Sequence, residues 1–167
     1  MTRIIGLDPG LRHTGWGIIE SSGTRLSHIA HGIINAHEDM PMAARLTTIH
    51  EEIMKVLKEY APQEAAVEEV FVNKNPLSTL KLGMARGIAL MSPAFYGIPV
   101  AEYGANKVKK SIVGNGHAEK EQVASMVSIL LPGVNPKKDA ADALAIAICH
   151  AHYRSFNETI LKNDCKA

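Results

Sequence analysis

The sequence predicts a single α/β domain with a five-stranded mixed sheet and helices on both of its faces. An apolar run at residues 3–8 has little alternation, which is typical of a strand buried on both sides. Two more extended segments precede the first helical pattern, and two further strands then alternate with helices. A chain of 167 residues suits one core better than two. We therefore expect one domain over residues 1–155 and a short C-terminal tail over 156–167.

The predicted strands begin with residues 3–8, which end on Asp8 before Pro9 and Gly10 force a turn. Residues 15–20 and 25–35 extend this strand into an antiparallel meander. A fourth strand is expected at 65–71 and a fifth at 98–103. Glycines are frequent around the end of the first strand, which indicates close approach of another backbone: Gly6, Gly10, Gly15 and Gly17.

The predicted helices begin with one that opens near Pro41 and keeps helical spacing to Tyr60. The second starts at Asn75–Pro76 and is expected to kink or end at Pro93. Two more are expected at 105–113 and 118–131. Asn135 as N-cap and Pro136 as first residue predict a final helix from 135 to about 153.

Composition limits the class of protein. A net charge of +1 excludes a protein surface that is basic throughout. Residues 71–120, however, carry seven lysines or arginines and two glutamates. This local excess of positive charge suits a phosphate-binding face as well as a solvated helix surface. No apolar run reaches the length of a membrane span, and no signal peptide pattern opens the chain. With two cysteines only, we expect a reducing, cytoplasmic location without membrane contact.

Acidic side chains occur where packing does not explain them. Asp8 ends a buried strand, and an ionised carboxylate there needs an ion, a hydrogen bond or a metal. Asp139 and Asp142 are three residues apart on the last helix, so both project from one face among alanines. An interaction of these two acids with the helix dipole is the alternative explanation. Glu68 and Glu69 alternate on the fourth strand, and periodicity alone does not choose between them.

Four carboxylates that converge would repel one another unless cations lie between them. Oxygen ligands without histidine or cysteine favour Mg²⁺ or Mn²⁺ over Zn²⁺. Two such ions about 3.5–4 Å apart promote phosphodiester cleavage. The pattern therefore indicates a metal-dependent phosphodiesterase.

Blocks of sequence, in a fixed order over nearly the whole chain, resemble the RuvC family of Holliday-junction resolvases. The matching blocks include Ile5-Gly6-Leu7-Asp8-Pro9-Gly10, Thr14-Gly15-Trp16-Gly17, Val67-Glu68-Glu69-Val70-Phe71, Val113-Gly114-Asn115-Gly116-His117-Ala118-Glu119-Lys120 and Asp139-Ala140-Ala141-Asp142. The resemblance implies an RNase H-like fold whose four catalytic and metal-binding acids are Asp8, Glu68, Asp139 and Asp142. It selects Glu68 and leaves the part played by Glu69 open.

The resemblance also implies an activity and partners. The family nicks opposed strands of four-way DNA junctions symmetrically in recombination and repair, leaving 5′-phosphate ends. It works as a homodimer with Mg²⁺, for which Mn²⁺ substitutes, and with the RuvA–RuvB branch-migration complex. On this basis we expect two ions per active site, and we take the second predicted helix as the candidate dimer interface.

Several residues are expected to face DNA. By resemblance Phe71 stacks on a base, although the pattern alone favours a core aromatic, and Lys109 and Lys120 hold oxygens near the scissile phosphate. Further candidates are basic residues that ordinary surface positions would explain equally well: Lys74, Lys81, Arg86, Lys107 and Lys110.

Two other functions fit parts of the pattern. Sugar kinases and actin-like phosphotransferases also open with a strand, an aspartate and a glycine-rich turn, but they need two such domains to enclose ATP. A non-catalytic junction-binding protein is the second alternative, and the complete acidic set argues against it.

Overall fold

The computed structural model of the chain describes residues 1–69 and 75–164, with side chains up to Arg154. Its five-stranded sheet has the order β3-β2-β1-β4-β5. The first three strands pair antiparallel, whereas β1 and β4, and β4 and β5, pair parallel. The strands are β1 (Thr2–Asp8), β2 (His13–Ser22), β3 (Arg25–Asn35), β4 (Glu64–Glu69) and β5 (Val100–Gly104).

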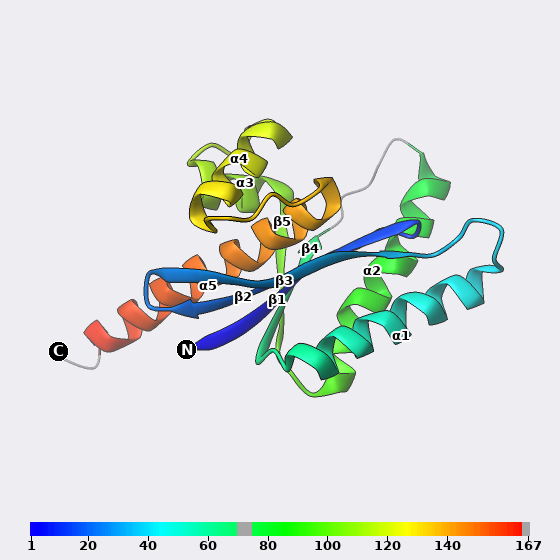
Figure 1. Cartoon of the computed structure of the whole chain (residues 1–167), viewed down its shortest axis with the longest axis horizontal. Helices are drawn as coiled ribbons and strands as arrows, with labels where there is room; N and C mark the ends of the chain where they lie inside the picture. The colour runs from blue at the N-terminus through cyan, green and yellow to red at the C-terminus, as the bar shows by residue number, and fades with distance from the viewer. Residues whose placement is uncertain (70–74, 165–167) are drawn as a thin grey trace.

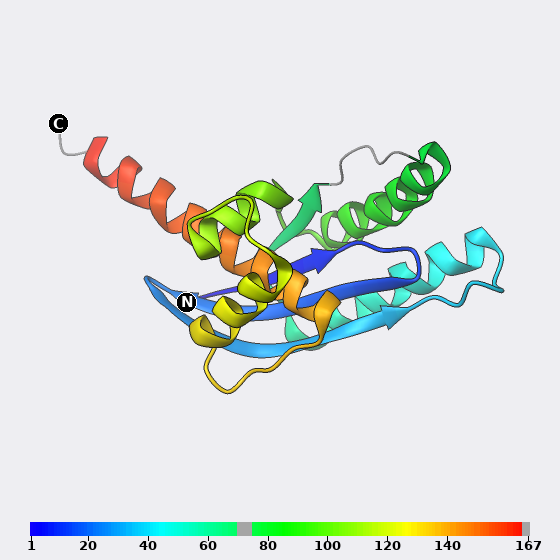
Figure 2. The same ribbon diagram turned by 90° about the horizontal axis from the view of Figure 1, so that it is seen from above.

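Helices cover both faces of this sheet, as the sequence predicts. Figures 1 and 2 show α1 and α2 together on one face, and α5 across the other with α3 and α4 on its outer side. The helices are α1 (Met42–Tyr60), α2 (Pro76–Tyr96), α3 (Ala105–Val113), α4 (Lys120–Leu130) and α5 (Lys138–Asp164). Within the described part of the chain, no helix has both the length and the apolarity to cross a membrane.

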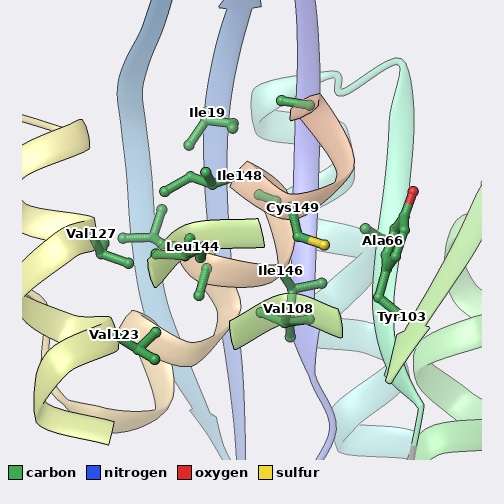
Figure 3. Close-up of a cluster of buried hydrophobic side chains, with 14 of the residues drawn as sticks. Ile19, Ala66, Tyr103, Val108, Val123, Val127, Leu144, Ile146, Ile148 and Cys149 are labelled. Carbon is green, nitrogen blue, oxygen red and sulfur yellow. The ribbon is translucent and has the colours of Figure 1, made fainter. Parts of the chain in front are cut away.

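Alternation along β1 divides the core into two clusters. Ile4 belongs to the cluster under α3, α4 and α5. Figure 3 shows Val108 and Leu144 of the same cluster. Ile5 and Leu7 belong to the cluster under α1 and α2. Side chains alternate along a strand, so Asp8 faces α5 with Ile4, and the same argument places Glu68 beside Ala66 on that face.

Glycines let α5 lie directly on the sheet. A Cβ atom on Gly6 would overlap the backbone of Ala143, and one on Gly15 would overlap the carbonyl group of Asp139. At Gly17 a Cβ atom would lie 2.7 Å from the Leu144 side chain. The close backbone approach predicted from these glycines is therefore confirmed.

Most predicted elements are present, and several boundaries differ. The predictions for β3 and α3 match at both ends. The second strand is longer than expected because it pairs with β3 from His13 to Ser22. The start of α4 is Lys120 instead of residue 118, because Glu119 forms a capping box with Gln122. The fourth strand runs from Glu64 to Glu69, and the rest of its predicted range lies outside the described residues.

The boundaries of three other elements also differ from the predictions. At Pro93 the sequence left a kink or an end of α2 open, and the end is wrong. The helix α2 continues past Pro93 to Tyr96, and Gly97, with φ of 96°, ends it. The last strand, β5, starts at Val100 instead of residue 98.

The predicted start of α5, with Asn135 as N-cap and Pro136 as first residue, is wrong by two residues. Val134 packs on the core cluster, and Pro136 lines a hollow together with residues of α4 and α5, so the segment between these helices has contacts of its own before α5 begins at Lys138. The helix then continues past residue 153 to Asp164, and its last part projects beyond the sheet in both views.

Candidate active site

Two of the predicted acids come together because their strands are neighbours. Leu7 of β1 is in register with Val67 of β4, so the next residues, Asp8 and Glu68, lie side by side on the α5 face. Their carboxyl groups share a hydrogen bond. Both line a pocket of about 90 Å³ beneath α3, α4 and α5.

The first turns of α5 bring the other two acids to this place. Asp8 is paired across the sheet with Gly15, and the backbone of Asp139 lies directly over Gly15. One carboxylate oxygen from each of Asp8, Asp139 and Asp142 lies within 4.8 Å of the others, a spacing that would allow a shared metal ion. Glu68 is outside this group of three and is connected to it by its hydrogen bond with Asp8.

Burial against apolar side chains and repulsion between the carboxylates disfavour ionisation of this cluster. Burial raises the pKa of Asp8 to about 8, and the charges of Glu68 and Asp142 add to the rise. Burial also raises the pKa of Glu68, while its hydrogen bond with Asp8 acts in the opposite direction. In the metal-free protein the Asp8–Glu68 pair therefore retains a proton near neutral pH.

Two lysines complete the pocket. The Nζ atom of Lys120 donates to Oδ2 of Asp142 at a distance of 2.9 Å. This hydrogen bond is the main reason why the pKa of Lys120 is raised. Lys109 also lines the pocket, and its charge lowers the pKa of Glu68. The pocket thus combines oxygen ligands for cations with two ammonium groups that suit phosphate oxygens.

The other predicted DNA-facing residues have different surroundings. Phe71 and Lys74 lie outside the described residues. Lys81 is exposed on α2, and Arg86 on the same helix forms an ion pair with Glu102 of β5. Lys107 and Lys110 are exposed on α3 and line a second hollow, away from the acids.

Glu69 is exposed, in contrast to Glu68, and it does not line the acidic pocket. The structure also adds features that the sequence pattern does not predict. The apolar walls of the pocket come from α3, α4 and α5: Ala105, Val108, Val123, Ala145 and Ile146. In sequence these residues look like ordinary helix-packing positions, and only their convergence around Asp8 relates them to the site.

Comparisons with known proteins agree with this geometry. The family model described as crossover junction endodeoxyribonuclease RuvC matches residues 4–150. The RuvC protein of Bradyrhizobium diazoefficiens is 56% identical over 161 residues, which cover 96% of this chain and 92% of that protein.

Solved structures give the same result. The Thermus thermophilus RuvC structure in complex with a Holliday junction substrate is 33% identical, with a TM-score of 0.88 over 94% of this chain and 97% of that one. The yeast mitochondrial Holliday junction resolvase Ydc2, at 12% identity, shares the fold with a TM-score of 0.70 over 99% of this chain and 85% of that one. The RNase H-like fold expected from the sequence is therefore confirmed, and the chain belongs to the RuvC family of crossover junction endodeoxyribonucleases.

Proposed function

We propose that the acidic pocket is the active site, where this chain hydrolyses phosphodiester bonds of four-way DNA junctions. The observation that carries the proposal is the convergence of Asp8, Asp139 and Asp142 within 4.8 Å. The Thermus thermophilus relative, which was solved with a Holliday junction substrate, supports the choice of DNA. The products would be symmetric nicks with 5′-phosphate ends, as recombination and repair require.

The residues present fit divalent cations. All four acids offer oxygen ligands. The pKa of Asp8 is raised first by burial and then by the charges of Glu68 and Asp142, and a bound cation would offset this cost of ionisation. We propose Mg²⁺, with Mn²⁺ as a substitute, and two ions per site held by Asp8, Glu68, Asp139 and Asp142. When bound, these ions supply Lewis acidity toward a phosphate and make water a better nucleophile.

Side chains of the pocket would bind the cations, hold the scissile phosphate and exclude water. Asp8 would hold a cation in its carboxylate form, so the proton that it carries in the metal-free protein would pass to solvent and the hydrogen bond with Glu68 would be lost. Lys109 and Lys120 hold oxygens of the scissile phosphate and offset the charge that develops on it. The apolar walls of the pocket exclude water other than the reacting molecule. This lowers the local dielectric constant and so strengthens each of these electrostatic interactions.

Other residues would hold the rest of the junction. Phe71 would stack on a base near the crossover, in keeping with the family resemblance. Basic residues would contact the DNA backbone: Lys74, Lys81, Arg86, Lys107 and Lys110.

Paired nicks require two sites at a fixed separation, which a homodimer with two-fold symmetry would supply. The candidate interface is α2, which exposes large apolar side chains along its length: Leu77, Leu80, Met84, Met91 and Phe95. Met84→Glu should halve the sedimentation mass, and an unchanged dimer would remove α2 from the interface. We further propose cytoplasmic action with the RuvA–RuvB branch-migration complex, on the basis of family membership.

The decisive experiment compares labelled four-way junctions with linear duplex in Mg²⁺ and maps the nicks on each strand. Asp8→Asn should still bind junctions without metal but should not cut them. Cutting near the parent rate by this variant would contradict the ligand role of Asp8. ATP hydrolysis without DNA would instead favour the phosphotransferase alternative, for which the described residues give no separate support.

A further inference from the structure

A pair of histidines lies on β3, the outer strand of the sheet, away from the acidic pocket. Nε2 of His28 and Nδ1 of His31 are 2.8 Å apart, and the two ring planes are tilted by 58°. Both side chains are partly exposed, so an ion can reach them from solvent. Two imidazole nitrogens that face each other at this distance are potential ligands of one metal ion.

A β-bulge brings the two rings to the same side of the sheet. Residues three apart on a regular strand point to opposite sides. On β3, Ala30 is paired with Ile18 of β2. The next pair joins His28 to Ile19 and skips Ile29, which is the extra residue of the bulge. This insertion reverses the alternation between the two histidines, and bulges commonly re-aim a side chain in this way.

The two rings lie on the face of the sheet that α5 covers. His31 is paired with Gly17, where a Cβ atom would lie 2.7 Å from the Leu144 side chain of α5. His28 is paired with Ile19, which belongs to the core cluster under α3, α4 and α5. Directly paired residues share a face, so both imidazoles flank this layer of helices on the outer strand.

The pair is separate from the acids and offers different ligand atoms. Asp8 is on β1, and β2 lies between β1 and β3, so strand spacing alone puts about 10 Å between the two places. Among the residues that the structure describes, the acids are the one group that could give a single ion three ligands. The histidines would give two, and water would supply the others. Carboxylates suit Mg²⁺, whereas imidazole suits Zn²⁺, Ni²⁺ and Cu²⁺, so the two places select different ions.

The separation of the two nitrogens fits neighbouring positions around one ion. Bonds from a metal to imidazole nitrogen are about 2.0–2.1 Å long. Two such bonds at a right angle, as in tetragonal Cu²⁺ or Ni²⁺ complexes, place the nitrogens about 2.8–3.0 Å apart, which matches the 2.8 Å observed. The tetrahedral angle of Zn²⁺ needs about 3.3–3.4 Å, an opening of about half an ångström. Each ring must also turn toward the ion, and rotation about its Cβ–Cγ bond is soft.

Binding would require no loss of a proton from the pair. When both rings are neutral, one donates an N–H group to the other, whose facing nitrogen accepts it. An ion can replace this hydrogen bond once the donor ring moves its proton, through water, to its second nitrogen. Among the described residues, these second nitrogens (Nδ1 of His28 and Nε2 of His31) have no hydrogen-bond partner, so either can carry the proton.

We infer that His28 and His31 form a second metal site, which binds one transition-metal ion of the Zn²⁺, Ni²⁺ and Cu²⁺ class and completes its coordination with water. The ion links the two sides of the bulge, because its ligands precede and follow the extra residue Ile29. It therefore stabilises the folded chain, in which the two nitrogens are already close. The site needs neither DNA nor Mg²⁺, so it does not depend on the proposed function.

The test records electron paramagnetic resonance of the protein with one equivalent of Cu²⁺ at pH 8, with excess Mg²⁺ present to fill the acidic pocket. The parent should show hyperfine splitting from two nitrogen nuclei, which carboxylate ligands cannot give. His28→Gln/His31→Gln should lose this splitting. The matched control, His37→Gln/His117→Gln, removes two exposed histidines from separate loops and should keep it. In calorimetric titration, His31→Gln alone should bind Cu²⁺ about 10²-fold more weakly or worse, because two linked ligands act together.

A second measurement uses the parent protein, so it does not depend on how the variants fold. Zn²⁺ should slow modification of His28 and His31 by diethyl pyrocarbonate severalfold, as read by mass spectrometry, and should leave His37 unchanged. A parent spectrum with oxygen ligands alone, equal spectra for the two double variants, or no protection by Zn²⁺ would overturn the second metal site. The His28→Gln/His31→Gln variant should cut junctions in Mg²⁺ like the parent, and loss of cutting in step with Cu²⁺ binding would show that the pair is not separate from the acids.

Discussion

The backbone carbonyl of Asp139 lies directly over Gly15, the residue that pairs with Asp8 across the sheet. This contact sets the height of α5 above β1 and β2, and therefore the distance between the acids on the helix and the acid on the strand. Any side chain at residue 15 would have to push α5 away from the sheet, because the clash is with backbone.

Gly15→Ala should therefore have two effects: it should move the acids of α5 away from Asp8, and it should destabilise the fold. Overpacking of this kind costs about 1–3 kcal/mol, and junction cutting should fall by more than the loss of folded protein explains. Urea unfolding and single-turnover cleavage measure the two effects. In urea unfolding, the matched control is Gly83→Ala on α2, where a Cβ atom would meet nothing within 4 Å and helix propensity predicts a gain of ~0.5–1 kcal/mol. Unaltered cleavage by Gly15→Ala would show that the spacing tolerates this shift.

Stability of the metal-free protein should fall as pH rises. The pKa of Asp8 is about 8 in the folded protein and about 4 in an unfolded chain, so the folded state holds an extra proton between these values. The stabilisation is complete below pH ~4 and is lost as pH rises through about 8. Each pKa unit corresponds to about 1.4 kcal/mol. Asp8→Asn carries no such proton, so its advantage over the parent in EDTA should grow from pH 5 to pH 8. A constant difference between the two proteins in urea unfolding would contradict the raised pKa.

Much of this site could be predicted from sequence because the relevant signals are local. The glycines around Asp8 predict close packing, and the spacing of Asp139 and Asp142 predicts that they share a helix face. The choice between Glu68 and Glu69 is different. Alternation assigns them to opposite faces, but only the tertiary structure determines which face α5 covers.

Long-range contacts account for the features that the sequence did not predict. The ion pair of Lys120 with Asp142 joins residues on two helices, and no local pattern specifies it. The start of α5 was missed because Asn135 followed by Pro136 is typical of a helix start, whereas the helix begins at Lys138 and Pro136 lines a hollow between α4 and α5. Its end was missed because the helix continues beyond the sheet to Asp164.

Divalent cations should stabilise the folded protein more at high pH than at low pH. A cation and the proton compete for Asp8, so binding of Mg²⁺ releases a proton while the pH is below about 8. The rise in Tm on adding Mg²⁺ should therefore be larger at pH 8.5 than at pH 6, and removal of the metal with EDTA should reverse it. Scanning calorimetry with and without Mg²⁺ measures this. An equal rise in Tm at both pH values would show that the ion does not displace a proton from the pocket.

Lys120→Gln should reduce cutting far more than binding. The ammonium group is 2.9 Å from Asp142 and lies at the edge of the pocket, where the scissile phosphate would enter. Loss of one such charge-stabilising group typically reduces kcat by about 10²–10³-fold. The control is Lys137→Gln, an exposed lysine just before α5 that does not line the acidic pocket. Single-turnover rates at saturating junction separate the two effects, and a parent-like rate would remove Lys120 from the reaction.

Glu64→Ala should destabilise the protein and weaken junction binding while leaving the four acids in place. Glu64 lies on the α5 face of β4, where it accepts hydrogen bonds from His150 and Arg154 and so ties α5 to the sheet. Loss of a partly buried acceptor of this kind costs about 1–3 kcal/mol. The matched control is Glu69→Ala on the same strand, an exposed position where a change within about 0.5 kcal/mol is expected. Because His150 also contacts Tyr103, and Tyr103 supports Lys107, the Glu64 variant should bind junction more weakly than the Glu69 variant at equal fractions folded. Equal junction affinities would show that Lys107 keeps its position without this support.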